Sequence, residues 1–285
     1  MYTRHLCVSA NDVIGWVTNE NSDSTRMLGE LADDCVTCGK EAVAVHERDG
    51  KRFFVTGEYC GFAFLTDGTL IEILPRTEGG TAEGRRKLCA ELCSRCGYTY
   101  DPSAVDGDMN FMEYFISVFA EETIRIIKSG VLSAYASREE NLTAVQGTIM
   151  FSENIRRNLV HRERIYVRHD VFTPDRAENR IIKAAAAMLV KLTANPRSSH
   201  LLKEALSFLD EVRMPYDIAA EFGKCINTRN TKKYSTTLSI CRMLFDRNEG
   251  TAFSGDSILC AQFYRMCTQP QVRKKRVKVV RRKRI

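Results

Sequence analysis

Two pairs of cysteines have the spacing of a metal site. Cys35 and Cys38 precede a glycine, and so do Cys93 and Cys96, which is the Cys-x-x-Cys-Gly pattern of a zinc knuckle. The pairs are 54 residues apart, whereas a compact zinc ribbon uses about 15 to 20. A zinc site is one interpretation. The other is that these are buried free thiols, because Cys89 and Cys93 are four apart on an expected helix.

Metal-dependent DNA cleavage would need two carboxylates to hold Mg²⁺ beside a lysine that polarises water. The sequence has no Glu-x-Lys, and its one Asp-x-Lys is Asp49-Gly50-Lys51, where Asp-Gly is better explained as a tight turn. It also has no Gly-x-x-x-x-Gly-Lys-Ser/Thr loop, and its five histidines lack metal-ligand spacing. We therefore assign no catalytic residue and expect neither nuclease nor P-loop chemistry.

Basic side chains in two segments could contact a partner's acidic groups or nucleotide phosphates. Arg156 and Arg157 are consecutive, so on a helix they point about 100° apart and at least one faces solvent. Arg229, Lys232 and Lys233 lie in a polar segment that leads to a helix. For all five, a solvated surface role is the alternative.

A third basic segment lies near the C-terminal end. Residues 273–284 hold nine Lys and Arg and no acid, and without them the net charge of +6 becomes −3. Such a segment attracts phosphate backbones, but it is equally typical of a disordered, solubilising tail. The candidate nucleic-acid contacts are Arg273, Lys274, Lys275, Arg276, Arg281 and Arg282.

The expected location is cytoplasmic. No apolar run approaches the length needed to span a bilayer, and the N-terminus lacks an apolar signal-peptide core. We therefore expect no membrane partner. The odd number of cysteines, 11, agrees with reduced thiols in such a compartment.

The sequence patterns of the helices and strands that position these residues predict an α+β fold. In residues 1–77, β-rich runs flank Asp49-Gly50 and Asp67-Gly68, which predicts two hairpins in a small antiparallel sheet or partly open barrel. After a polar link, residues 85–250 form a mainly helical domain with a short β-hairpin. Helices are expected at 85–96, 111–129, 174–194, 199–211 and 232–246, and strands at 148–151 and 164–168. Residues 251–285 are expected to be irregular and to end in the basic, disordered tail.

Four motifs occur in the order found in one family. They are Tyr59-Cys-Gly61 with Asp67-Gly-Thr-Leu-Ile-Glu-Ile-Leu-Pro75, Ser129-Gly-Val-Leu-Ser-Ala-Tyr135, the run from Gly147 to Lys183, and Asn227-Thr-Arg-Asn-Thr-Lys-Lys-Tyr234. Together they resemble the McrC component of the McrBC system, which restricts DNA carrying 5-methylcytosine. The resemblance covers residues 55–247. Its structural signature is Gly147, Phe151, Glu178, Asn179 and Arg180, of which Asn179 and Arg180 are expected to fix the packing of strand against helix.

The resemblance implies a partner and an activity. McrC-like proteins dock on a hexameric AAA+ GTPase ring, McrB, and stimulate GTP hydrolysis, while a C-terminal nuclease domain cuts DNA. For this sequence we expect the docking part to be present and the nuclease domain to be missing. We expect a regulatory or adaptor subunit of a type IV-like restriction endonuclease complex for phage defence, with the nuclease either lost or on a separate chain. The resemblance does not call for zinc or another cofactor. The alternative is a zinc-stabilised nucleic-acid-binding module that uses the basic tail.

Overall fold

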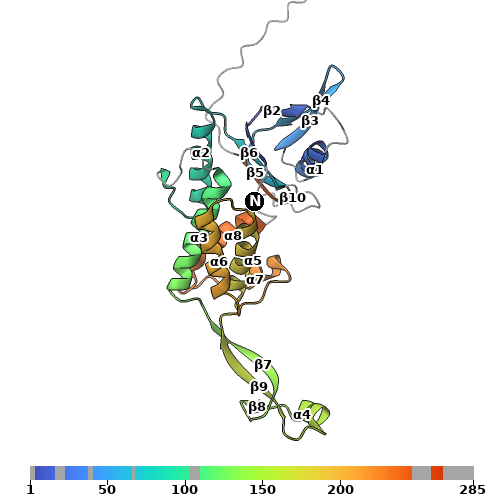
Figure 1. Cartoon of the computed structure of the whole chain (residues 1–285), viewed down its shortest axis with the longest axis vertical. Coiled ribbons are helices and arrows are strands. Elements are labelled where there is room, and N and C mark those ends of the chain that lie inside the picture. The colour runs from blue at the N-terminus through green and yellow to red at the C-terminus, as the bar shows by residue number, and fades with distance from the viewer. Residues whose placement is uncertain are drawn as a thin grey trace, which may run out of the picture.

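The computed structural model describes residues 4–16, 23–37, 41–65, 68–102, 110–245 and 258–265. In Figure 1 these residues form an elongated molecule with three parts. Two small sheets lie at one end, a group of helices lies in the middle, and a narrow three-stranded sheet extends from the helices at the other end. The predicted α+β class is confirmed.

The two predicted hairpins belong to different sheets. β3 (Val43–Arg48) and β4 (Lys51–Thr56) pair around Asp49 and Gly50, both with positive φ, and β2 (Val13–Trp16) lies on the other side of β4. β5 (Tyr59–Leu65) and β6 (Thr69–Leu74) pair in the middle of a second sheet, between β10 (Ile258–Arg265) beside β5 and β1 (Arg4–Ser9) beside β6. In this sheet β1 (Arg4–Ser9) runs parallel to β6, so the expected purely antiparallel arrangement is corrected. A parallel pair requires a crossover, which here includes β2, α1 (Asp23–Thr37) and the first hairpin.

The C-terminal segment also differs from its prediction. Within residues 251–285, for which we expected irregular structure, Ile258–Arg265 form β10. This strand runs antiparallel to β5 and places the end of the described chain against the N-terminal sheet. Period-2 alternation is weak in Ile258-Leu-Cys-Ala-Gln-Phe-Tyr-Arg265, so the strand depends on its pairing with β5.

The middle of the molecule is helical. Its helices are α2 (Gly80–Arg95), α3 (Phe111–Lys128), α5 (Ala177–Leu192), α6 (Pro196–Phe208), the short α7 (Ile218–Lys224), and α8 (Ser235–Phe245), which the 3₁₀ turn η2 (Lys232–Tyr234) precedes. One hydrophobic core runs from the sheets into these helices; for example, Phe62 of β5 packs against Phe111 of α3. Sheets and helices therefore form one body.

Helix ends follow local chemistry that the sequence contains. Asn110 caps α3 by accepting a hydrogen bond from the backbone N–H of Glu113. Gly130, with φ +83°, follows the C-terminal end of the helix, close to the expected end at residue 129. The start of α5 differs from the expected residue 174. The Thr173 hydroxyl accepts a hydrogen bond from the Asp175 N–H in a turn, and the helix begins at Ala177. α1 and α7 were not predicted. The seven-residue α7 is too short to show a clear helical period.

The projecting part, which we call the arm, comprises Ala134–Thr173. β7 (Ala134–Leu142) and β9 (Ile165–Thr173) pair antiparallel over their whole length, from Ala134 opposite Thr173 to Leu142 opposite Ile165. The short β8 (Thr148–Ile149) pairs with β9, and α4 (Phe151–Asn158) forms the tip. The sequence predicted a hairpin here but not its length. β7 is mostly polar, so its period is hidden.

Candidate partner-docking site

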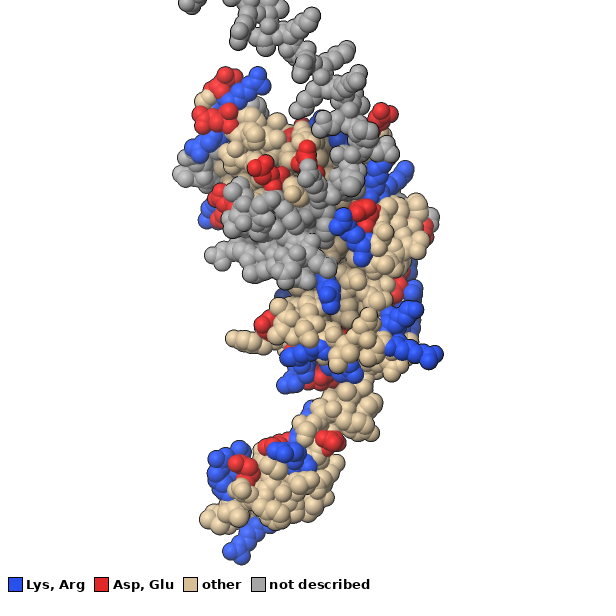
Figure 2. Space-filling view, turned by 180° about the vertical axis from the view of Figure 1, so that it is seen from behind, with Lys and Arg blue, Asp and Glu red and all other residues tan. Residues whose placement is uncertain are grey.

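The arm is a narrow projection with charged side chains along its strands (Figure 2). Polar side chains face each other across the ladder. Arg168 Nε lies 3.0 Å from a carboxylate oxygen of the oppositely charged Glu139, and His169 Nε2 lies 3.7 Å from Glu140. Only a few arm side chains are buried, among them Tyr166 and Val167. Strand pairing and cross-strand charge pairs therefore hold the arm, rather than a hydrophobic core.

Gly147 allows the chain to turn into the tip. Its φ is +76°, and a Cβ at this position would collide with the backbone carbonyl of Arg168 and with His169. A side chain is therefore excluded both by the backbone conformation and by space. This gives a physical reason for glycine at a position that the resemblance marks as structural.

Phe151 needs a correction. It was expected to end a strand over residues 148–151, but β8 stops at Ile149 and Phe151 begins α4 with 71% of its surface exposed. The Met150 N–H still bonds to the carbonyl of Tyr166 at 2.9 Å, so the chain leaves the sheet only after that contact. The pattern Thr-Ile-Met-Phe suits a strand, but pairing with β9 ends before Phe151.

Asparagine side chains attach the tip helix to the strands. The buried Asn158 exchanges two hydrogen bonds with Asn141 of β7, at 2.8 and 2.9 Å, and donates a third to Asn154 at 2.7 Å. Asn154 also accepts from the backbone N–H of Tyr166 at 2.9 Å. Sequence reasoning did not assign these residues a role. The available signal was the i, i+4 spacing of Asn154 and Asn158, which places both amides on one helix face.

Arg156 and Arg157 lie on the outer part of α4. Both contact Glu153 at 3.0 Å, and the Arg157 guanidinium lies over the Tyr166 ring, 4.9 Å from its centroid. The hydrogen bond from Arg157 is the main reason why the pKa of Glu153 is lowered, although the carboxylate faces water. The two arginine side chains stay 69% and 51% exposed, so they can still reach a partner.

An apolar stripe occupies another part of the same helix. Phe151, Ile155 and Leu159 follow one another at i, i+4 spacing and are 71%, 66% and 73% exposed. Val160, next to them, is also exposed. Apolar side chains at such spacing normally face a core, but here they face solvent at the far end of the arm. We call this set the tip stripe.

The side-chain amide of Asn179 contacts both ends of the arm at the point where the arm joins the body. Asn179 donates to the carbonyl of Leu132, just before β7, at 2.9 Å, and to the carbonyl of Pro174, just after β9, at 2.7 Å. The Tyr234 hydroxyl accepts from the Leu132 N–H at 2.9 Å and donates to the Asn179 carbonyl oxygen at 2.9 Å. Three of the motifs that carry the resemblance, far apart in sequence, thus meet at this point.

The second basic segment lies beside this junction. Lys233 reaches the C-terminal end of α3, where its ammonium donates to Ser129 Oγ at 3.1 Å and to the carbonyl of Gly130. Arg229 and Lys232 are exposed. Lys233 therefore has an intramolecular role that the sequence did not predict, and a partner contact by Arg229 or Lys232 stays a prediction.

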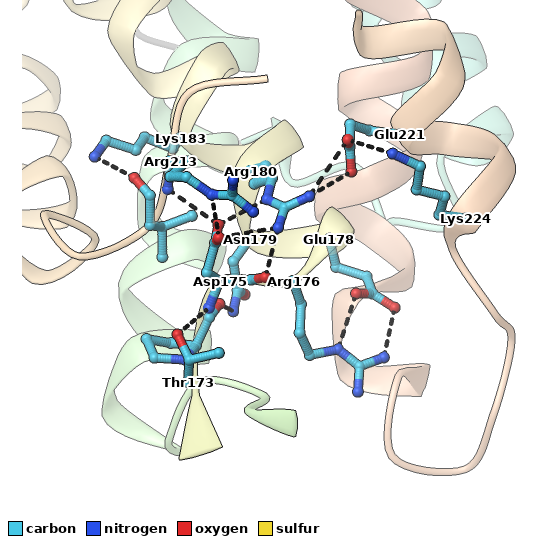
Figure 3. A network of polar contacts seen from close by, with 12 residues as sticks. Thr173, Asp175, Arg176, Glu178, Asn179, Arg180, Lys183, Arg213, Glu221 and Lys224 are labelled. Carbon is cyan, nitrogen blue, oxygen red and sulfur yellow. Dashed lines mark hydrogen bonds and ion pairs between the residues drawn. The ribbon is translucent and has the colours of Figure 1, made fainter. Parts of the chain in front are cut away.

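A charged network surrounds the start of α5 (Figure 3). Arg180 contacts the Asp175 carboxylate at 2.6 and 2.9 Å and Glu221 of α7 at 3.2 Å, and Arg213 also contacts Asp175. Burial raises the pKa of Asp175, but hydrogen bonds from Arg180 and Arg213 outweigh it and hold the pKa well below its ordinary value. The buried Glu178 pairs with Arg176 at 3.1 Å through both oxygens. These pairs tie α7 and the preceding loop to α5.

The three candidate zinc ligands that the structure describes do not gather at one site. Cys35 lies in α1, which packs on β3, whereas Cys93 and Cys96 lie at the end of α2, which packs on β1 and β6. Within the described ranges, no three His, Cys, Asp or Glu side chains gather so that they could hold a metal ion. Cys93 instead contacts the Tyr114 hydroxyl at 3.8 Å, and burial raises the pKa of its thiol. Two sets of predicted contact residues lie outside the described residues. One is the fourth expected zinc ligand, Cys38, and the other is the basic tail with Arg273, Lys274, Lys275, Arg276, Arg281 and Arg282.

None of the helices that the structure describes combines the length and apolar character needed to cross a bilayer.

The fold and this site can be compared with known proteins. The fold is similar to a chain in the cryo-EM structure of the Thermococcus gammatolerans McrBC complex, with 17% identity and a TM-score of 0.64, over 91% of this chain and 82% of that chain. It is also similar to a chain in the refined half-complex from the tetradecameric assembly of Thermococcus gammatolerans McrB AAA+ hexamers with bound McrC. There the identity is 17%, the TM-score is 0.61, and the match covers 85% of this chain and 64% of that chain. No curated protein matches the chain.

The family comparison covers more than the four motifs. Residues 55–268 match the family described as McrBC 5-methylcytosine restriction system component. The match includes the second hairpin, the helical body, the whole arm and β10. The predicted resemblance is confirmed, and this chain belongs to the McrBC 5-methylcytosine restriction system component family.

Proposed function

We propose that this chain is a regulatory or adaptor subunit of a system that restricts modified DNA. It docks on an AAA+ GTPase ring through the arm and stimulates the ring's NTP hydrolysis. The similar half-complex contains McrB AAA+ hexamers with bound McrC, which supports a ring as the partner. The absence of any Glu-x-Lys from the sequence supports a chain without its own metal-dependent nuclease site.

The observation that carries this proposal is the arm itself. It extends from the body, contributes nothing to the hydrophobic core of the described residues, and exposes both the tip stripe and two arginines at its end. Contiguous exposed apolar side chains with a polar rim are typical of a protein interaction site, and arginine is enriched in interfaces. The four asparagine hydrogen bonds lie within the arm and so do not stabilise the body directly. They hold the tip in one defined shape that a partner can bind.

Arginine contacts would add orientation to this docking. An arginine that bonds a carboxylate of a ring subunit forms charge-assisted hydrogen bonds with fixed geometry. The pair with Glu153 costs little to open, because both arginine side chains are exposed to water and Glu153 is only partly buried. Arg156 and Arg157 are therefore the residues that we expect to contact the partner.

The test uses an McrB-like AAA+ GTPase from the same organism as the candidate partner. The two proteins are co-expressed, and GTP turnover by the purified ring is measured with increasing amounts of this chain. Arg156→Ala with Arg157→Ala is expected to raise the half-saturating concentration about tenfold or more. Arg48→Ala with Arg86→Ala removes the same charge from the opposite end of the molecule and should leave the titration unchanged.

Two results would contradict the proposal. Turnover that does not respond to the wild-type chain would remove the docking role. Magnesium-dependent cleavage of duplex DNA by the purified chain alone would remove the claim that it lacks a nuclease site.

DNA is proposed to reach this subunit through the complex or through the basic residues near 273–284. In the second case, affinity for duplex DNA should fall steeply with salt, because each phosphate contact releases counterions. Removing residues 273–285 should then flatten that dependence.

A further inference from the structure

The two strands of the arm leave the body at neighbouring points. Leu132 precedes β7 and Pro174 follows β9, and the amide of Asn179 bonds to the carbonyls of both. Asn179 lies in the first turn of α5 and is almost fully buried. One side chain of the body therefore holds both ends of the arm.

Tyr234 completes this contact from a distant part of the chain. Its ring is buried in the core, and its hydroxyl bridges the Leu132 N–H and the Asn179 side chain. Burial raises the pKa of Tyr234 to about 12, so the hydroxyl keeps the proton that it donates to Asn179. All three polar atoms of the bridge thus have defined donor and acceptor roles.

Lys233 adds a contact on the solvent side. Its ammonium bonds to Ser129 and Gly130 at the end of α3, two residues before Leu132. We call Asn179, Lys233 and Tyr234 the root clamp. It fixes the chain just before β7 begins and just after β9 ends.

We propose that the residues of the root clamp are positioning residues, which hold the arm in the one direction that the ring requires. This inference rests on the proposed docking function. The core of the described residues includes no residue from Ala134 to Thr173, so the arm's direction depends on its attachment. An attachment through two strand ends alone would let the arm swing, and the fraction of molecules ready to bind would fall. The root clamp removes that freedom before binding occurs.

The first experiment measures the free chain. Tyr234→Phe keeps the ring but removes the hydroxyl, which leaves the Leu132 N–H and Asn179 without their partner. Hydrogen exchange at residues 130–136 should become roughly tenfold faster, while exchange within α3 and α6 stays unchanged. Tyr216→Phe removes a hydroxyl from a fully exposed tyrosine and serves as the matched control.

The second experiment separates positioning from a direct effect on the ring's chemistry. In the GTP turnover titration, Tyr234→Phe should raise the half-saturating concentration roughly tenfold and leave the maximal turnover unchanged, because a saturated ring holds every arm in place. Lys233→Met should shift the same midpoint in the same direction. Lys233→Arg keeps a cationic donor near the carbonyls at the end of α3, so its half-saturating concentration should equal that of the wild type.

The outcomes are distinct. Unchanged exchange at residues 130–136 in a folded Tyr234→Phe variant would overturn the proposal, and so would a loss of maximal turnover at an unchanged midpoint. If Tyr234→Phe does not fold, the exposed Lys233 provides the same test with Lys233→Met and Lys233→Arg. If the wild-type chain fails to stimulate the ring, the docking function fails, but hydrogen exchange still decides whether the clamp holds the arm.

Discussion

At the residue scale, the buried carboxylate of Glu72 connects four parts of the body. It lies on β6 with no exposed surface; one oxygen accepts from the Phe111 N–H at the start of α3, at 2.6 Å, and the other from His5 at 2.8 Å and Arg85 at 3.0 Å. Burial raises the pKa of Glu72, but the hydrogen bond from His5 and the Arg85 charge outweigh it, so the pKa is lowered overall. The carboxylate therefore joins the sheet to α2 and α3 in its charged form.

We expect Glu72→Gln to reduce the free energy of unfolding by about 3 kcal/mol at neutral pH, because it leaves the Arg85 charge largely buried without a partner. Since the folded pKa lies below the ordinary value of 4.5, the wild-type advantage is complete above that value and is lost as the pH falls below it. Chemical denaturation at several pH values measures the difference.

The control for this prediction is Glu91→Gln, which breaks an exposed pair with Arg95 on α2 and should cost less than about 1 kcal/mol. A Glu72→Gln penalty that stayed constant from neutral to acidic pH would show that the carboxylate charge is not the stabilising feature.

At the element scale, α4 is an amphipathic helix whose apolar side is not covered by any element of the described chain. Its asparagines face the strands, and its tip stripe faces solvent. The helix has only eight residues, too few to be stable alone in water, so the asparagine contacts with β7 and β9 must hold it. The tip stripe is consequently free to contact another molecule.

Ile155→Ser together with Leu159→Ser should leave thermal stability nearly unchanged, within about 0.5 kcal/mol, because both side chains are exposed already. The affinity for the AAA+ ring should fall about tenfold or more, as expected for buried apolar contacts at an interface. Binding is measured by titrating labelled ring with the variant. Phe208→Ser, which replaces an exposed apolar residue of the body, should bind like the wild type; equal affinities for all three chains would exclude the tip stripe from the interface.

At the scale of the whole molecule, body and arm are stabilised by different forces. The body has a continuous hydrophobic core, whereas the arm relies on strand pairing, charge pairs and asparagine bonds. Because Ala134 and Thr173 are directly paired, their Cα atoms lie about 5 Å apart. A short turn in place of the arm can therefore connect the two chain ends that the body presents there.

Replacing residues 134–173 with a two-residue Asn-Gly turn should therefore give a folded body with cooperative thermal unfolding near the wild-type temperature. The same variant should not stimulate GTP turnover at any concentration. Calorimetry and the turnover titration provide the two measurements. A body that fails to fold without the arm would contradict the separation of the two parts, and full stimulation would place the docking surface elsewhere.

Much of the fold could be predicted from sequence because its signals are local. Asp49-Gly50 predicts a tight turn, and both residues have the positive φ that such a turn requires. Gly130 ends α3 for the same kind of reason. Where a signal depends on pairing, the prediction was wrong or incomplete: Phe151 looks like the end of a strand, and β10 looks irregular, until the neighbouring strand is known.

The sequence by itself determined the α+β class, the family and the segments that matter, since hydrophobic period, turn residues and motif order are all properties of the chain. Only the tertiary structure decided what those segments do together. Asn179 and Tyr234 are 55 positions apart and meet at Leu132, and Lys233, which by sequence could serve a partner, is used to hold the end of α3. The physical reason is that a hydrogen bond between distant side chains depends on the path of the backbone between them, and that path is set by packing of the whole body.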